Sequence, residues 1–115
     1  MTKKCNVIVV ANQKGGTGKT TTTENVGIGL ANQGKKVLMV DFDPQGDLSA
    51  CLGLKNTDDM ENTISKAMND IIYDKKVDYN NLIIHHEEQI DLIPSNIELA
   101  AFELTLVRVM NRDSV

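Results

Sequence analysis

A glycine-rich segment at residues 14–20 limits what this chain can fold into more than any other feature. It reads Lys-Gly-Gly-Thr-Gly-Lys-Thr and lies between a β-branched run at 7–11 and a stretch with helical character from Gly18 to Gln33. Glycines lack the side chains that would stop a backbone from curling with successive N–H groups pointing inward. The order of strand, glycine loop and helix therefore predicts a phosphate-binding loop, to which the helix N-terminus adds partial positive charge.

The spacing within this loop matches the second half of a common phosphate-loop pattern, G-x-x-x-x-G-K-[ST]. Gly18-Lys19-Thr20 supplies that half, whereas Gln13 stands where the first glycine would be. In this pattern Lys19 reaches the β- and γ-phosphates, and the Thr20 hydroxyl is suited to ligate Mg²⁺. The alternative is a strand-to-helix turn that binds nothing. Helix propensity alone does not account for four consecutive threonines at 20–23, which are mediocre helix formers.

An acidic segment follows at the distance that one strand–helix–strand crossover requires. Residues 37–40 form a second apolar strand candidate, and Asp41 and Asp43 come directly after it. A right-handed crossover brings the end of this strand to the same sheet edge as the glycine loop. Two carboxylates there can organise Mg²⁺ and its waters, or orient an attacking water. Taken alone, Asp-Pro-Gln-Gly at 43–46 is better interpreted as a surface turn, but the preceding loop reverses that preference.

Residues 12–21 and 40–46 together resemble the ParA/Soj branch of the ParA/MinD partition ATPases, which has a deviant Walker A loop, and residues 92–99 resemble it too. The resemblance implies a three-layer α/β fold of the P-loop NTPase type with a mainly parallel sheet. It implies that residues 1–115 form a single ATPase domain, incomplete at its C-terminus and equivalent to the N-terminal half of a family member. It also implies ATP and Mg²⁺ as cofactors, and ATP hydrolysis that serves plasmid or chromosome partitioning.

The same resemblance gives roles to individual residues. Lys14 would reach across a nucleotide-sandwich dimer to the phosphates of the partner subunit, and Asp43 would position the hydrolytic water. Thr20 would ligate Mg²⁺ with support from Asp41, and Gln45 would belong to a nucleotide-sensing switch. The expected nucleotide-binding residues are Lys14, Gly15, Gly16, Thr17, Gly18, Lys19, Thr20, Thr21 and Gln45.

Partners also follow from the resemblance: an ATP-dependent homodimer, a centromere-binding ParB-like protein, and non-specific DNA bound through parts of the family absent here. The net charge of −4 also argues against a DNA-binding surface on these residues, because such a surface needs clustered Lys and Arg. Lys35-Lys36 and Lys75-Lys76 are only pairs, and solvated loop charges explain them better.

Cysteine usage indicates a cytoplasmic protein without a membrane contact. Cys5 and Cys51 form no C-x-x-C or metal-ligand spacing, and the sequence has no signal peptide or apolar spanning run, so both are expected to be reduced thiols. Neither supplies the cluster cysteine that a relative of the nitrogenase iron protein would need. His85-His86 could suggest a metal site, but adjacent residues of an extended segment point to opposite faces. A polar hairpin or loop tip is therefore expected there.

Strand candidates lie at 7–11, 37–40, 82–84 and 90–93. A short helix is expected at 47–53, another after Thr63, and a last one whose start is marked by a capping box of Ser95 and Glu98. The last helix is apolar around much of its circumference, which predicts association. One alternative function stays open: a catalytically inactive, truncated fragment that binds nucleotide weakly or interferes with dimers.

Overall fold

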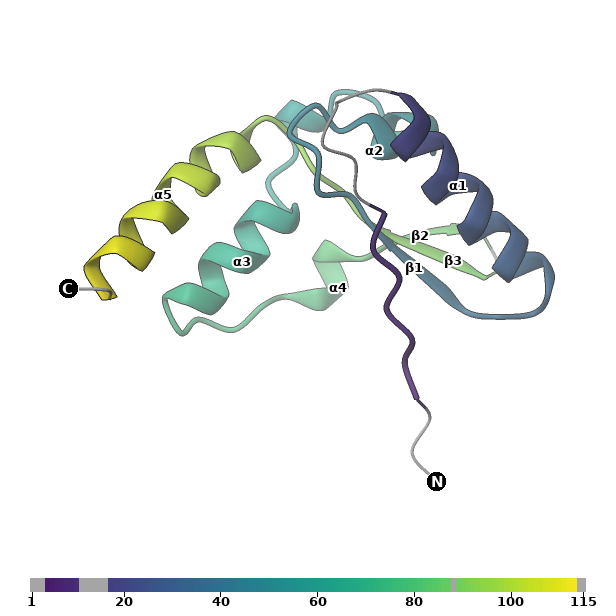
Figure 1. Cartoon of the computed structure of the whole chain (residues 1–115), viewed down its shortest axis with the longest axis horizontal. Helices are drawn as coiled ribbons and strands as arrows, with labels where there is room; N and C mark the ends of the chain where they lie inside the picture. The colour runs from purple at the N-terminus through teal and green to yellow at the C-terminus, as the bar shows by residue number, and fades with distance from the viewer. Residues whose placement is uncertain (1–3, 11–16, 88, 114–115) are drawn as a thin grey trace.

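The described residues form helices and three short strands, a mixed α/β arrangement (Figure 1). The computed structural model describes residues 4–10, 17–87 and 89–113. Its elements in chain order are α1 (Thr17–Asn32), β1 (Val37–Val40), α2 (Asp47–Cys51), the 3₁₀ helix η1 (Thr57–Asp59), α3 (Ile64–Ile72), α4 (Tyr79–Leu82), β2 (Ile84–Glu87), β3 (Ile90–Ile93) and α5 (Glu98–Asp113).

The three strands β1, β2 and β3 form one mixed sheet in the order β1-β3-β2. β1 and β3 are parallel, with Met39 opposite Leu92, whereas β2 and β3 are antiparallel. The expected parallel arrangement therefore holds for only one of the two strand pairs. The connection from Glu87 to Ile90 is too short for a crossover, and so short a connection permits only antiparallel pairing. The strand expected at 82–84 begins instead at Ile84, because Leu82 ends α4.

The apolar run at 7–10 is not a strand of this sheet, so the prediction of a buried strand there was wrong; residue 11 lies outside the described ranges. Residues 4–10 belong to no helix or strand, and the side chains of Val7 and Val9 are 82% and 80% exposed. β-Branched residues favour extended backbone whether or not it is paired. A buried strand also needs a hydrogen-bonded neighbour and cover on both faces, which sequence composition cannot provide.

Helices cover both faces of the sheet, and each face has its own apolar core. Successive strand residues point to opposite faces. One core joins β1 and β3 to α1 and α2, and contains Met39, Leu48, Leu52, Ile90 and Leu92. The other joins β3 to α3, α4 and α5, and contains Ile64, Ala67, Leu82, Ile93, Leu99 and Phe102. Figure 1 shows α1 and α2 apart from α3 and α5.

A glycine ends α1 and directs the chain into β1. Gly34 has φ of 84°, Gly34 N donates to the Ala31 carbonyl (2.9 Å), and Lys35 N donates to the Leu30 carbonyl (3.1 Å). These bonds satisfy the last carbonyls of the helix in the pattern known as a Schellman motif. The helix end thus lies at Asn32, within one residue of the expected end at Gln33.

The start of α5 is capped by residues other than those expected. Asn96 Oδ1 accepts from Glu98 N (3.1 Å), and Asp58 Oδ1 accepts from Ile97 N (3.0 Å). The Ser95 hydroxyl is buried and has no hydrogen-bond partner among the described residues, so the capping box of Ser95 and Glu98 was wrong. Sequence spacing missed the cap because Asp58 comes from a distant turn.

Beyond its start, α5 buries only one side in the described structure. Leu99 and Phe102 are buried, whereas Leu104, Val107 and Met110 are more than half exposed. This confirms the expected apolar surface on the last helix. Within the described ranges, every helix is too short or too polar to cross a membrane.

Candidate functional site

The first turn of α1 contains most of the described residues of the predicted phosphate loop. Lys14, Gly15 and Gly16 lie outside the described residues, and α1 begins at Thr17. Gly18, Lys19 and Thr20 follow within the first turn, and Thr21 starts the next. N–H groups in the first turn of a helix have no intrahelical partner and are available to an anion.

The side chains in this turn differ in burial. Thr20 is buried, Lys19 is half-buried and Thr21 is exposed. Thr23 Oγ donates to the Lys19 carbonyl at 2.9 Å, which fixes the turn that carries the lysine. The lysine and the threonine that the sequence selected therefore occupy the N-terminal end of a helix, as the phosphate-loop pattern requires.

Asp41 lies at the carboxyl end of β1, and the residue is 2% exposed. Asp41 N donates to the Ile93 carbonyl (3.0 Å), which extends the pairing of β1 with β3. The carboxylate accepts three hydrogen bonds: Oδ1 from Asp43 N (3.0 Å), and Oδ2 from both Ser49 N (3.0 Å) and Ser49 Oγ (2.7 Å). A buried charge needs such partners, because an unpaired one is very costly.

Residues 43–46 form a tight turn between β1 and α2. Asp43 Oδ1 accepts from Gln45 N (3.0 Å), and the Asp43 carbonyl accepts from Gly46 N (2.8 Å). Gly46 has φ of 67° and precedes α2 as its N-cap residue. The side chain of Asp43 is half-buried and that of Gln45 is exposed. The turn expected from Asp-Pro-Gln-Gly is thus present, and it holds Asp43 beside the end of the sheet.

A third carboxylate, Asp47, belongs to the same cluster, and the sequence analysis missed it. The pKa of Asp47 is raised above 3.8 by burial, then by the Asp43 charge and a hydrogen bond with Asp43, and then by the Asp41 charge; Lys19 acts in the opposite direction. Lys19, Asp41 and Asp43 therefore all lie within electrostatic reach of Asp47. The sequence indicated Asp47 only as the start of a helix, because its place beside Asp43 depends on how the turn at 43–46 folds.

The cluster fits a hydrated Mg²⁺ ion better than a closed metal cage. Within the described residues, no three His, Cys, Asp or Glu side chains form a ready ligand set. Mg²⁺ keeps several waters and usually takes one or two protein carboxylates plus phosphate oxygens. The charges of Asp43 and Asp41, which raise the pKa of Asp47, would be offset by a hydrated divalent cation nearby.

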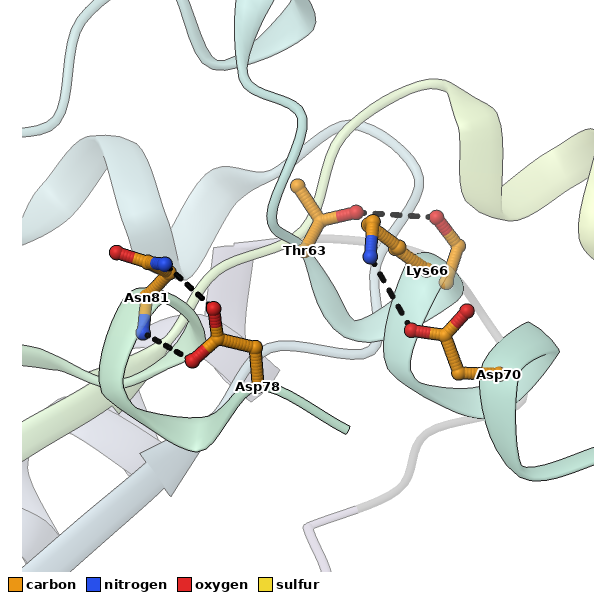
Figure 2. A network of polar contacts seen from close by, with 6 residues as sticks. Thr63, Lys66, Asp70, Asp78 and Asn81 are labelled. Carbon is orange, nitrogen blue, oxygen red and sulfur yellow. Dashed lines mark hydrogen bonds and ion pairs between the residues drawn. The ribbon is translucent and has the colours of Figure 1, made fainter. Parts of the chain in front are cut away.

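The polar side chains around a small cleft between α3 and α4 bond to one another and have a structural role (Figure 2). Lys66 Nζ pairs with Asp70 Oδ2 (3.1 Å), Asp78 Oδ2 accepts from Asn81 Nδ2, and the Thr63 hydroxyl contacts that of Ser65 (3.0 Å). The cavity beside them has a volume of ≈ 10 Å³. That volume holds at most a single water.

The two histidines lie in β2, within the β2–β3 hairpin, as expected. His85 Nδ1 lies 2.8 Å from Asp91 Oδ1, and His86 Nε2 lies 3.7 Å from Glu87 Oε1. Both cysteines, Cys5 and Cys51, are free and exposed. Neither residue type forms a metal site in the described part of the chain.

Curated proteins and a family model match nearly all of this chain. A model described as an AAA domain (AAA_31) matches residues 5–115. The chain is 39% identical over 107 residues to the sporulation initiation inhibitor protein Soj of Bacillus subtilis, covering 93% of this chain and 40% of that protein. It is 34% identical over 106 residues to the chromosome partitioning protein ParA of Caulobacter vibrioides, covering 92% of this chain and 38% of that protein.

A solved structure is similar to this chain in fold as well as in sequence. Cobyrinic acid a,c-diamide synthase from Mycobacterium smegmatis, with bound ATP analog and magnesium, superposes with a TM-score of 0.71 at 38% identity, covering 84% of this chain and 37% of that one. The chain thus spans well under half the length of these relatives. Over the residues that it shares with them, the chain belongs to the AAA domain family AAA_31, as an ATPase domain of the ParA/Soj type.

Proposed function

We propose that this protein binds ATP with Mg²⁺ and hydrolyses it as a ParA-type ATPase in plasmid or chromosome partitioning. The observation that carries the proposal is that Lys19, in the first turn of α1, and Asp43 and Asp41, after β1, all act electrostatically on Asp47 at the start of α2. Phosphoryl transfer uses cations that neutralise phosphate and carboxylates that hold a hydrated metal or position the attacking water. The bound ATP analog and magnesium of the similar synthase structure support the same ligands here.

In this proposal each residue has one task. Lys19 and the first-turn N–H groups of α1 bind the β- and γ-phosphates, and the Thr20 hydroxyl ligates Mg²⁺, which supplies charge neutralisation when bound. Asp41 supports the metal indirectly, because its carboxylate holds the turn that contains Asp43. Asp43 orients the attacking water, and Gln45 senses the nucleotide from its exposed position after Asp43.

Lys14 and the partner proteins complete the proposal and rest on the family alone. Lys14 acts across an ATP-dependent homodimer on the phosphates of the second subunit. A ParB-like centromere-binding protein stimulates turnover, and non-specific DNA binds elsewhere in the assembly. The names of Soj and ParA among the relatives support this setting.

A second candidate is nucleotide binding without turnover. One observation favours it: both oxygens of Asp41 already accept hydrogen bonds from the protein, so this carboxylate can serve the turn alone. The two candidates differ in whether bound ATP is hydrolysed, not in whether it binds.

Calorimetry with ATP and Mg²⁺ on the complete protein tests the binding step. Lys19→Ala should weaken ATP affinity about tenfold or more, since it removes a charge-assisted contact to phosphate. Lys55→Ala, at an exposed position outside the cluster, is the matched control and should change nothing. Wild-type protein that ignores ATP and Mg²⁺ would contradict the proposal.

Hydrolysis then separates the two candidates. Asp43→Asn should keep ATP binding and abolish turnover, and Lys14→Ala should slow turnover of the dimer more than it weakens binding. Wild-type protein that binds ATP but never hydrolyses it, even with its DNA-bound partner, supports the second candidate.

A further inference from the structure

Ser49 connects the candidate site to the rest of the fold through a buried chain of hydrogen bonds. Its side chain is 0% exposed. Ser49 Oγ lies 2.7 Å from Asp41 Oδ2, and Ser95 N donates to the same Ser49 Oγ at 3.2 Å. Ser95 lies in the segment between β3 and α5, so three separate parts of the chain meet at one hydroxyl.

The direction of these bonds is fixed by chemistry. A backbone N–H can only donate, and an ionised carboxylate can only accept. The single hydroxyl proton of Ser49 must therefore point to Asp41, while its lone pair receives the N–H of Ser95. Ser49 N donates to the same Asp41 oxygen (3.0 Å), so residue 49 alone supplies both bonds to Oδ2.

The other oxygen of Asp41 holds the backbone of Asp43. Asp41 Oδ1 accepts from Asp43 N at 3.0 Å, and Asp43 Oδ1 in turn accepts from Gln45 N. A carboxylate bonded on both oxygens cannot rotate without breaking at least one bond. By fixing the orientation of the Asp41 carboxylate, Ser49 therefore also fixes the position of the Asp43 backbone N–H.

We propose that Ser49 is a positioning residue for ATP hydrolysis: by fixing the Asp41 carboxylate, it sets the backbone of Asp43 and hence the place of the Asp43 carboxylate. The inference rests on the proposed function, in which Asp43 orients the attacking water. Ser49 itself touches neither nucleotide nor water in this scheme. Misplacing a catalytic group by about 1 Å from a distance can slow a reaction on the order of a hundredfold.

The chain offers a matched control in a second buried serine. Ser65 is 5% exposed and lies in α3, and its hydroxyl contacts that of Thr63 at 3.0 Å. Ser65→Ala removes a buried hydroxyl of the same kind without touching Asp41. Any effect that comes from general loss of stability should appear in both serine variants.

The experiment compares Ser49→Ala, Ser49→Cys, Ser49→Thr and Ser65→Ala in the complete protein. Three quantities are measured: ATP affinity with Mg²⁺ by calorimetry, the single-turnover rate of hydrolysis, and amide hydrogen exchange of residues 42–46 with and without nucleotide. Cysteine is close to serine in size but a weak donor, whereas threonine keeps the hydroxyl. If Ser49→Ala fails to fold, Ser49→Cys carries the test.

Ser49→Ala and Ser49→Cys should slow hydrolysis about tenfold or more, keep ATP affinity within about twofold, and speed amide exchange at 42–46. Ser49→Thr should restore most of the rate, and Ser65→Ala should leave all three quantities unchanged. Unchanged turnover and exchange in Ser49→Cys would overturn the inference, as would an equal loss of turnover in Ser65→Ala. A wild-type protein that neither binds nor hydrolyses ATP would instead overturn the proposed function, and this inference with it.

Discussion

Gly46 lies directly against the backbone of Ser95: a Cβ atom on residue 46 would come 3.0 Å from the Ser95 carbonyl oxygen. Gly46 ends the turn that carries Asp43, and Ser95 precedes α5. Two backbones approach this closely only where one residue lacks a side chain. The turn at the candidate site and the start of the last helix therefore fit together as one unit.

Gly46→Ala should destabilise the protein more than a glycine replacement at a similar backbone angle in open space. Gly46 has φ of 67° and Gly53 has φ of 95°, and both angles disfavour a side chain by about 1 kcal/mol. Only at residue 46 would the new Cβ also press on a backbone oxygen, so we expect a total of about 2–3 kcal/mol there. Urea unfolding of both alanine variants measures the difference. Equal losses for the two variants would show that the Ser95 backbone moves aside freely.

Two glycines of α1 should respond to alanine in opposite directions. Gly29 is exposed and has nothing within 4 Å of a built Cβ, whereas a Cβ on Gly27 would collide with the end of the buried Met39 side chain. Alanine favours a helix over glycine by about 1 kcal/mol, so Gly29→Ala should stabilise the protein by about that amount. Gly27→Ala gains the same helix propensity but overpacks the core by about 1–3 kcal/mol against the Met39 side chain, so it should destabilise the protein by up to about 2 kcal/mol net. Thermal unfolding of the two variants is the measurement, and a gain in stability with Gly27→Ala would contradict the close packing of α1 on β1.

Asn96 should be among the costly polar side chains to remove. It is 1% exposed, its Nδ2 donates to the carbonyls of Thr57 (2.9 Å) and Met60 (3.1 Å), and its Oδ1 caps Glu98 N. Asn96→Ala leaves these buried groups unpaired and should cost about 2–4 kcal/mol in denaturant unfolding.

A matched pair of variants identifies the reason for that loss. Asn96→Asp keeps the cap acceptor but sets a carboxylate against two carbonyl oxygens, so at neutral pH it should cost at least as much as the alanine change. Asn81→Ala removes an amide that bonds exposed Asp78 and should cost about 1 kcal/mol or less. A harmless Asn96→Asp would show that only the helix cap matters at this position.

Local sequence signals predicted most of the helices and two of the three strands. The stop of α1 at Gly34 follows from a glycine at the end of a helical stretch, and β1 and β3 follow from short apolar runs. Asp41 and Asp43 could be placed at a sheet edge because both follow β1 directly. Such features depend on a few neighbouring residues, and their physical cause lies within the same window of sequence.

Features that depend on distant residues could not be predicted in this way. The run at 7–10 has the composition of a strand, but pairing requires a neighbour that composition does not specify. The bond between Ser49 and Ser95, and the cap from Asp58 to α5, join segments far apart in sequence. Asp47 could be seen as a helix start, yet its membership in the acidic cluster arises only when the turn at 43–46 folds back.

Asp47 should make the protein less stable as the pH rises. Its pKa is raised above 3.8 in the folded protein, first by burial and then by Asp43 and Asp41, with Lys19 opposing them. Between pH 3.8 and the higher folded pKa, the native state binds more protons than the unfolded state, so the free energy of unfolding falls with increasing pH across that window. Below pH 3.8 the carboxyl is protonated in both states and this loss is absent.

Asp47→Asn removes the charge and should therefore raise Tm at neutral pH in the absence of divalent cations. The gain should shrink as the pH falls and vanish below about pH 3.8, when wild type and variant both carry a neutral group. Asp59→Asn, at an exposed position in η1 outside the cluster, is the control for loss of one negative charge. Thermal unfolding across this pH range measures all three proteins. A lower Tm for Asp47→Asn at neutral pH would mean that attraction to Lys19 outweighs burial and the repulsion from Asp43 and Asp41.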